Sequence, residues 1–404
     1  MSLRKDLKEG YSPLLFLASL GAGGAVITFF MYLLFMIPHK GAPIPRFEHI
    51  MAVLANGPVW QQALTVLALA GIVFFAFLHF RLLVWNITEY SKFKKTGGYQ
   101  ALRSGNAEVQ LMAIPLTYAM SVNVAFILGA LFVPGLWNVV EYLFPLALVA
   151  FGAIGIYAIK IFTEFFSRVL TKGGFDCEKN NSLAQMLAAF AFAMVGVGFS
   201  ASGAMSHNTL TSAIGLGLSA GFVSLALLLM TIKIVLGFRA MFEHGVNKEA
   251  SVSLWIVIPI LTTIGIALYR ISMGLHHNFD VPNSAAGHYL MFAVIVFIQM
   301  FFGLIGHHVM KRIGYYETFI SGSGKSPVAY AAICPGIAAV VMANFLVNFG
   351  LVNAGIVPKF SIGYFALYLP IVYLQLKTIA VMFKLNRKLL KAEPAQAEAQ
   401  PKAA

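Results

Sequence analysis

Two stretches near opposite ends of the chain decide the fold: SPLLFLASLG (12–21) and SPVAYAAICP (326–335). Both begin with Ser-Pro, continue as an apolar segment and reach a glycine or a proline at the tenth position. Related openings are found at NAEVQLMAIP (106–115), NSLAQMLAAF (181–190) and ASVSLWIVIP (250–259). Five openings of one pattern predict a tandem repeat whose unit is a long helix pair.

Each opening begins an apolar stretch, and a second apolar stretch follows it. A membrane-spanning helix needs about 20 largely apolar residues. Ten stretches qualify, at 13–37, 58–85, 111–133, 138–166, 183–206, 209–238, 251–275, 286–310, 327–351 and 360–383. Hydrophobic residues make up 59% of the chain and charged residues 11%, whereas a soluble domain has about 45–50% apolar and about 25% charged residues. The sequence therefore predicts an all-α polytopic membrane protein.

The domain organisation follows from these ten spans. We expect one transmembrane domain at 13–385, preceded by a short segment at 1–12 and followed by a disordered tail at 386–404. Lys and Arg number 20 in the two termini and the connections on their side, but 3 in the connections on the other side. This asymmetry predicts that both termini are cytoplasmic, in the plasma (inner) membrane. The net charge of +13 then reflects mainly the basic residues on the cytoplasmic side of the membrane, and no nucleic-acid partner is expected.

The tenth position of the five openings suggests what the repeat surrounds. It is occupied by Gly21, Pro115, Phe190, Pro259 and Pro335. A proline removes one helical hydrogen bond and kinks the helix, and in lipid the freed carbonyl needs protein, water or a cavity. We therefore expect an inner ring of odd-numbered helices around a pore and an outer ring of even-numbered helices. The alternative is that prolines are simply frequent in membrane helices.

The residues that precede the tenth position are expected to approach the pore axis near one level. They are Leu20, Ile114, Ala189, Ile258 and Cys334.

The charges within the spans predict the kind of solute. No ionisable side chain falls in the central third of a predicted span, which disfavours proton-coupled carriers and cation channels that use carboxylates there. A small anion suits an apolar pore better. Arg270, near the outer end of the seventh span, is the residue expected to attract anions. Its alternative roles are an ion pair with Glu141 or an interaction with the membrane interface.

The ten histidines permit a competing function, a b-type haem redox subunit with histidine pairs near each membrane face. Six are expected near the outer face and four at the cytoplasmic ends, the latter being His79, His244, His307 and His308. Histidines at the membrane interface are the simpler interpretation. With only two cysteines, Cys177 and Cys334, no metal site or disulfide framework is predicted. We expect no cofactor and no enzymatic activity.

The ten spans and their tandem pairing resemble the tellurite-resistance/dicarboxylate transporter family, which includes the slow-type anion channels of plants. The local matches are IPLTYAM (114–120), SLWIVIPILTTIG (253–265) and SPVAYAAICPGIAAV (326–340), and the resemblance extends over about 12–385. It implies a homotrimer in which each protomer has its own pore. It also implies a phenylalanine gate just before the proline of the ninth helix. That position is Cys334 here, so Phe190 is the residue that could take its place.

The sequence thus predicts a transmembrane anion channel or uniporter for a small inorganic or organic anion. Two other classes stay open: the haem subunit described above, and a membrane anchor that transports nothing.

Overall fold

The structure is a computed structural model that describes residues 2–176 and 178–392. Within these residues ten helices are long and apolar enough to cross a membrane, and the described part contains no strand beyond one isolated bridge. The prediction of an all-α polytopic membrane protein is confirmed.

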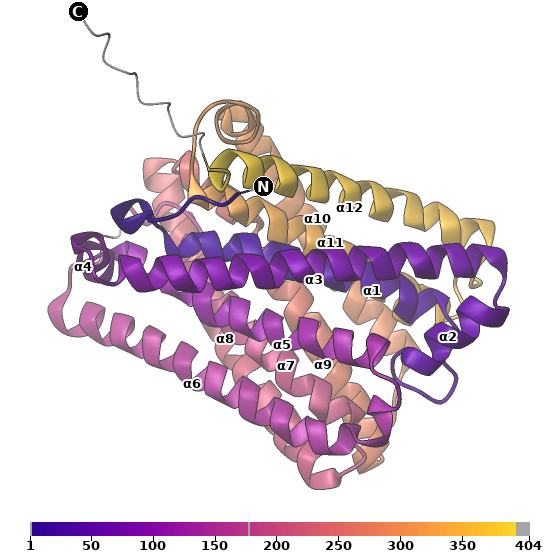
Figure 1. The fold of residues 1–404 in the computed structure, drawn as a ribbon. Helices are drawn as coiled ribbons and strands as arrows, with labels where there is room; N and C mark the ends of the chain where they lie inside the picture. Colours follow the sequence, from indigo (N-terminus) through magenta and orange to yellow (C-terminus); the bar gives the residue numbers. More distant parts are fainter. Residues whose placement is uncertain (1, 177, 393–404) are drawn as a thin grey trace, which may run out of the picture.

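The ten helices form five consecutive pairs, shown in Figure 1. The pairs are α1 (Phe16–Met36) with α3 (Val59–Phe93), α5 (Ala113–Phe132) with α6 (Val140–Lys172), α7 (Leu187–Met205) with α8 (Thr209–His244), α9 (Val257–Phe279) with α10 (Ala285–Arg312), and α11 (Ile333–Phe345) with α12 (Ile362–Leu389). Two short helices, α2 (Phe47–Asn56) and α4 (Gly97–Ser104), lie in the connections.

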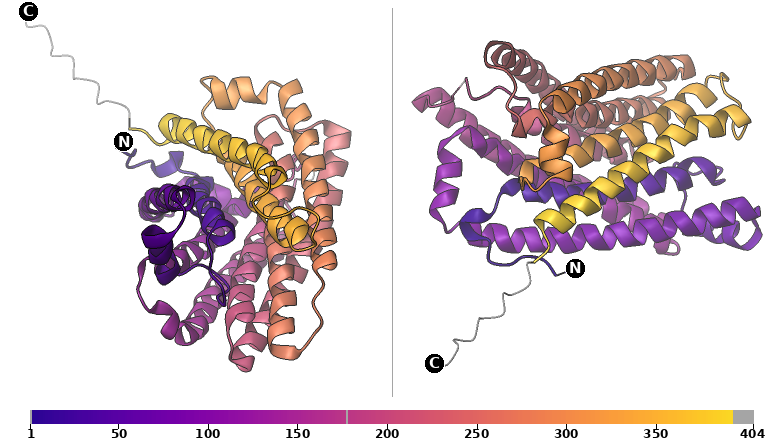
Figure 2. Two further views of the ribbon diagram at one scale, coloured as in Figure 1. Left: turned by 90° about the vertical axis from the view of Figure 1, so that its right-hand side faces the viewer. Right: turned by 90° about the horizontal axis from the view of Figure 1, so that it is seen from above.

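The first helix of each pair belongs to an inner ring. Around this ring α1 contacts α5, α5 contacts α7, α7 contacts α9, α9 contacts α11, and α11 contacts α1 again. The most apolar parts of these five spans are 61–94% buried, whereas those of the other five are 22–33% buried. The predicted inner and outer rings are therefore confirmed, and Figure 2 shows the bundle from two further sides.

Each inner helix opens with a 3-10 segment. These segments are Pro13–Leu15, Asn106–Met112, Ala184–Met186, Glu249–Ile256 and Pro327–Ala332. Pro115, Pro259 and Pro335 are each the third residue of the α-helix that follows. A proline is tolerated in the first turn of an α-helix because an N–H group there has no partner within that helix. The shared prolines therefore mark the change from a 3-10 helix to an α-helix. The sequence had suggested a kink within an α-helix instead.

Both described ends of the chain lie at one face of the bundle. Leu3 pairs with Lys391 in an antiparallel bridge, and the Arg4 amide donates to the Leu390 carbonyl at 2.9 Å. We call this face the terminal face and the other the opposite face. Because α12 continues to Leu389, residues 386–389 are helical and not part of the tail expected from 386. The remainder of that tail, 393–404, lies outside the described residues, as does Cys177.

Four outer helices continue by six or eight residues further towards the terminal face than the sequence predicts. Helix α3 ends at Phe93, α6 at Lys172, α8 at His244 and α12 at Leu389, where ends at 85, 166, 238 and 383 were expected. As a result, over the whole spans, His79 and Arg81 fall in the central third of α3, Lys160 in that of α6 and Lys377 in that of α12. His79 is fully buried, and the three basic side chains are exposed on the outside of the bundle. The prediction that no ionisable side chain occupies a central third is therefore wrong for these four residues.

Candidate functional site

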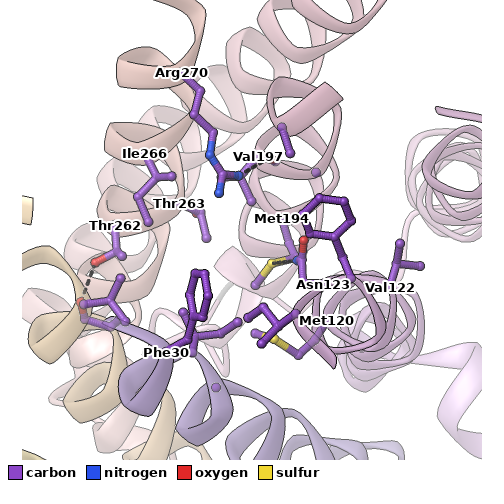
Figure 3. A pocket seen from close by; sticks show the side chains of 18 of the residues that line it. Phe30, Met120, Val122, Asn123, Met194, Val197, Thr262, Thr263, Ile266 and Arg270 are labelled. Atoms are coloured by element: carbon purple, nitrogen blue, oxygen red, sulfur yellow. Dashed lines mark hydrogen bonds between the residues drawn. The ribbon is translucent and has the colours of Figure 1, made fainter. Parts of the chain in front are cut away.

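A cavity of about 190 Å³ lies inside the inner ring. All five inner helices contribute to its wall, and Figure 3 shows the side chains that project into it. Along α1 the lining runs from Leu20 to Leu34, and along α9 it runs from Pro259 to Arg270. Since both helices run from the terminal face to the opposite face, this central cavity lies in the middle part of the ring.

The end of the central cavity coincides with the shared position of the repeat. Gly21, Phe190, Pro259 and Cys334 line it there, together with Leu20; we call these five residues the register layer. Closer to the terminal face the inner helices are packed: Phe16, Met186 and Tyr330 are 0% exposed and none of them lines the cavity. The register layer is therefore the closed end of the cavity.

Five of the residues singled out in the sequence do not line the cavity. They are Ile114, Pro115, Ala189, Ile258 and Pro335. Ile258 is packed towards α10, because a side chain on Gly303 of that helix would come within 4.0 Å of its Cδ1. Neighbouring residues of an α-helix point about 100° apart, since one turn holds 3.6 residues. Two consecutive residues therefore rarely both face the axis. Leu20 and Gly21 are an exception, since both line the cavity.

One outer helix also reaches the central cavity. Phe144, Ala147 and Phe151 of α6 line it between α5 and α7. Gly198 of α7 makes this possible, because a Cβ there would lie 2.1 Å from the Phe151 ring. The expectation that the pore is lined by odd-numbered helices alone is thus incomplete. The sequence signal for the contribution of α6 is the glycine at position 198, which leaves room for the Phe151 ring.

A second cavity, of about 390 Å³, adjoins the central cavity on the side of the opposite face, and we call it the vestibule. The two cavities share Leu34, Ile44, Met205, Arg270 and Phe345 as lining residues. The basic side chains that line the vestibule are His39, Arg270, His277 and Lys359, and no described carboxylate is among its lining residues. Lys359 carries no site signal in the sequence, where it contributes only to the count of basic residues in the connections.

Arg270 stands where the vestibule meets the central cavity. Its Nη1 donates to the Val197 carbonyl of α7 at 3.1 Å, and its side chain extends from α9 into the cavity in Figure 3. Within the described residues no carboxylate lies within 4.0 Å of its guanidinium. Glu141, the ion-pair partner considered from the sequence, instead accepts from the Ser206 hydroxyl at 2.7 Å and the His207 amide at 2.9 Å.

The hydroxyl groups in the wall of the central cavity are directed at the backbone. Thr262 donates to the Ala338 carbonyl at 3.0 Å and Thr263 to the Pro259 carbonyl at 3.0 Å. Ser202 donates to the Phe144 carbonyl at 3.4 Å. A hydroxyl has one proton to donate, so these three groups offer no donor to a solute. Arg270 is then the charged donor that faces the cavity.

Of the ten histidines, all of which are described, two are buried: His79 and His288. The Nδ1 of His79 donates to the Ser19 carbonyl at 2.8 Å, and its Nε2 lies 2.8 Å from the Ser121 hydroxyl. The Nε2 of His288 lies 3.1 Å from the Ser272 hydroxyl. The described chain also holds no cluster of three or more His, Cys, Asp or Glu side chains that could bind a metal ion.

Burial lowers the pKa of two groups that line the vestibule, His39 and Lys359. For His39, loss of solvent around the ring is the main cause, and the nearby Lys359 charge acts in the same direction. His39 is therefore neutral at pH 7 and gains its charge in acid.

No family model matches the sequence, and no curated protein matches it either.

Proposed function

We propose that the protein is a passive channel or uniporter for small anions. The observation that carries this proposal is a cationic path without carboxylates: the vestibule has Arg270, Lys359 and two histidines in its wall, and it meets the central cavity at Arg270. A cleft lined by one sign of charge concentrates ions of the other sign. A cation would meet unpaired positive charge at the junction of the two cavities.

The register layer supplies the gate in this proposal. The side chain of Phe190 is 4% exposed and faces the closed end of the cavity. An apolar constriction stops ions by excluding water, and a benzyl group clears a passage by changing rotamer. Cys334 lies in the same layer, where the resemblance to the anion-channel family implies a phenylalanine.

We further propose that the protein resides in the plasma (inner) membrane with its terminal face in the cytoplasm. The excess of Lys and Arg on the terminal side supports this orientation. The opposite face and its vestibule would then be external. By the same resemblance to the tellurite-resistance/dicarboxylate transporter family, the functional unit is proposed to be a homotrimer with one pore in each protomer.

Reconstitution into liposomes tests the proposal. Under opposing gradients of potassium chloride and potassium nitrate, the reversal potential should follow the anion gradients, and Arg270→Gln should reduce the flux. Arg46→Gln is the matched control, because Arg46 lies at the same face but lines neither cavity. A cation-selective current, or wild-type liposomes without flux, would contradict the proposal.

A further inference from the structure

The wall of the central cavity restricts which anion fits it best. Beyond Arg270, the lining consists mainly of Met, Phe, Ile, Leu and Val side chains. The hydroxyls of Ser202, Thr262 and Thr263 donate to backbone carbonyls. The amide nitrogen of Asn123 lies 3.8 Å from the sulfur of Met194, as a weak donor to it. An anion that moves past Arg270 therefore loses its hydration water and meets the Asn123 amide as the remaining side-chain donor of the described wall, which is costly.

The guanidinium of Arg270 offers one place for an anionic head group. Arginine has five N–H donors, and the structure uses one of them, on the Val197 carbonyl. The other four face no protein acceptor in the described chain. A planar fork of donors matches the two oxygens of a carboxylate. Since the carbonyl fixes the guanidinium, the head group is held at the mouth of the central cavity.

The remaining space is suited to an apolar tail. The cavity measures about 190 Å³, and an apolar cavity of about 150 Å³ is large enough to take up benzene. A compact ring or short branched chain therefore fits beneath a carboxylate held by Arg270. A second carboxylate would be buried among Met and Phe side chains without a cation, and a buried unpaired charge is strongly disfavoured.

We infer that the central cavity is a binding site for monocarboxylates with a compact apolar tail. Arg270 binds the carboxylate, and the tail lies against the side chains between Phe30 and the register layer. This inference rests on the proposed function and narrows the class of anion that the site binds. It assigns the tightest binding to an amphiphilic monoanion, in preference to a halide or a dicarboxylate.

Isothermal titration of the purified full-length protein tests the site with four probes: benzoate, its neutral isostere benzamide, the dianion succinate, and chloride. Benzoate is expected to bind at least about ten-fold more tightly than each of the other three, because it alone satisfies both the guanidinium and the apolar wall. If succinate or chloride binds as tightly as benzoate, the inference is wrong. This comparison uses the wild-type protein, so it does not depend on the folding of any variant.

Two variants then locate the site. Arg270→Gln should weaken benzoate binding by about ten-fold or more and leave benzamide binding nearly unchanged, while Arg46→Gln should alter neither. Ala201→Leu, which adds volume to the cavity wall, should weaken both benzoate and benzamide. Unchanged benzoate affinity in folded Arg270→Gln protein would place the site elsewhere and overturn the inference.

The inference and the proposed function fail in different ways. Anion flux in liposomes without benzoate binding would leave the transport proposal standing and refute the monocarboxylate site. Benzoate binding that depends on Arg270, in a protein that conducts no anion, would support the site and refute transport.

Discussion

Gly203 of α7 and Gly215 of α8 approach so closely that a Cβ on Gly215 would lie 2.8 Å from the Gly203 backbone nitrogen. Helix α9 meets them at the same place, because a Cβ on Gly274 would lie 2.7 Å from the Gly203 carbonyl oxygen. Three helix backbones thus pack directly against one another, with the Leu216 side chain of α8 beside Gly203 and Gly274. In a membrane such contacts replace the hydrophobic effect as a source of helix association.

Gly215→Ala is therefore expected to destabilise the protein by about 1–3 kcal/mol, the usual cost of overpacking, since backbone has to move. Gly217→Ala on the same helix is the control. A Cβ there meets nothing within 4 Å, so the higher helix propensity of alanine should stabilise the helix by about 0.5–1 kcal/mol. Thermal unfolding in detergent measures both, and equal stabilities for the two variants would contradict the close approach.

The gate is tested by Phe190→Ala. Removal of the benzyl group from the register layer should open an anion leak in liposomes. Phe192→Ala is the matched control: its ring packs against Phe162 and Phe222, at 5.7 and 6.1 Å between centroids. That variant should lose stability, by about 3–5 kcal/mol on the precedent of soluble cores, without a leak. A Phe190→Ala protein that loses stability and shows wild-type flux would exclude the gate.

Thiol labelling from the opposite face checks which residues line the path. In a Cys177→Ser background, a small anionic methanethiosulfonate should modify Cys334. It should also modify Leu20→Cys once Cys334 has been replaced by Ser. Ile258→Cys should stay unmodified, since Ile258 is packed towards α10. The reverse pattern would show that the wall of the cavity is wrongly assigned.

Anion flux is expected to rise when the medium at the opposite face is acidified. Burial lowers the pKa of His39, so this ring is neutral at pH 7 and gains a positive charge only below its ordinary value of about 6.5. His49, whose ring lies 6.3 Å from that of His39, and Lys359 are the charged or titratable groups near it. The added charge makes the vestibule more positive and attracts anions.

His39→Gln should remove this acid-dependent increase. His207→Gln is the control, because His207 is exposed at the same face and lines neither cavity. The measurement is the anion flux of both variants between pH 7.5 and pH 5. An increase that survives in His39→Gln would assign the effect to another group.

An absorption spectrum separates transport from the haem alternative. The purified protein is expected to show no Soret band. The two buried histidines, His79 and His288, already have hydroxyl or carbonyl groups at hydrogen-bond distance. A Soret band that His79→Ala or His288→Ala abolishes would replace the transport proposal by a redox function.

The sequence predicts the arrangement of helices better than the wall of the cavity. Apolar length and the repeat give the ten spans, and the tenth position of the repeat identifies the inner ring, because these features are local. Which side chain faces the axis depends on the rotation of each helix. For this reason Phe190 and Cys334 line the cavity, whereas Ile114 and Ile258 do not.

Contacts between segments that are distant in the chain do not follow from local sequence patterns. Phe151 enters the cavity because Gly198, 47 positions later in the chain, leaves room for its ring. Lys359 joins the vestibule from a connection between two helices. Each depends on the packing of two elements, and a pattern within one element does not encode it.

Because the vestibule lies at one face of the protein, a blocking compound is expected to act differently from the two sides of the membrane. A bulky impermeant anion, too large for the central cavity of about 190 Å³, would lodge in the vestibule of about 390 Å³ and block the path from the opposite face. From the terminal face the same compound meets the packed layer that contains Phe16 and Tyr330, both 0% exposed, and finds no space to occupy. Inhibition of this protein by such compounds is therefore expected to be one-sided, and the effective side is the one that bears the vestibule.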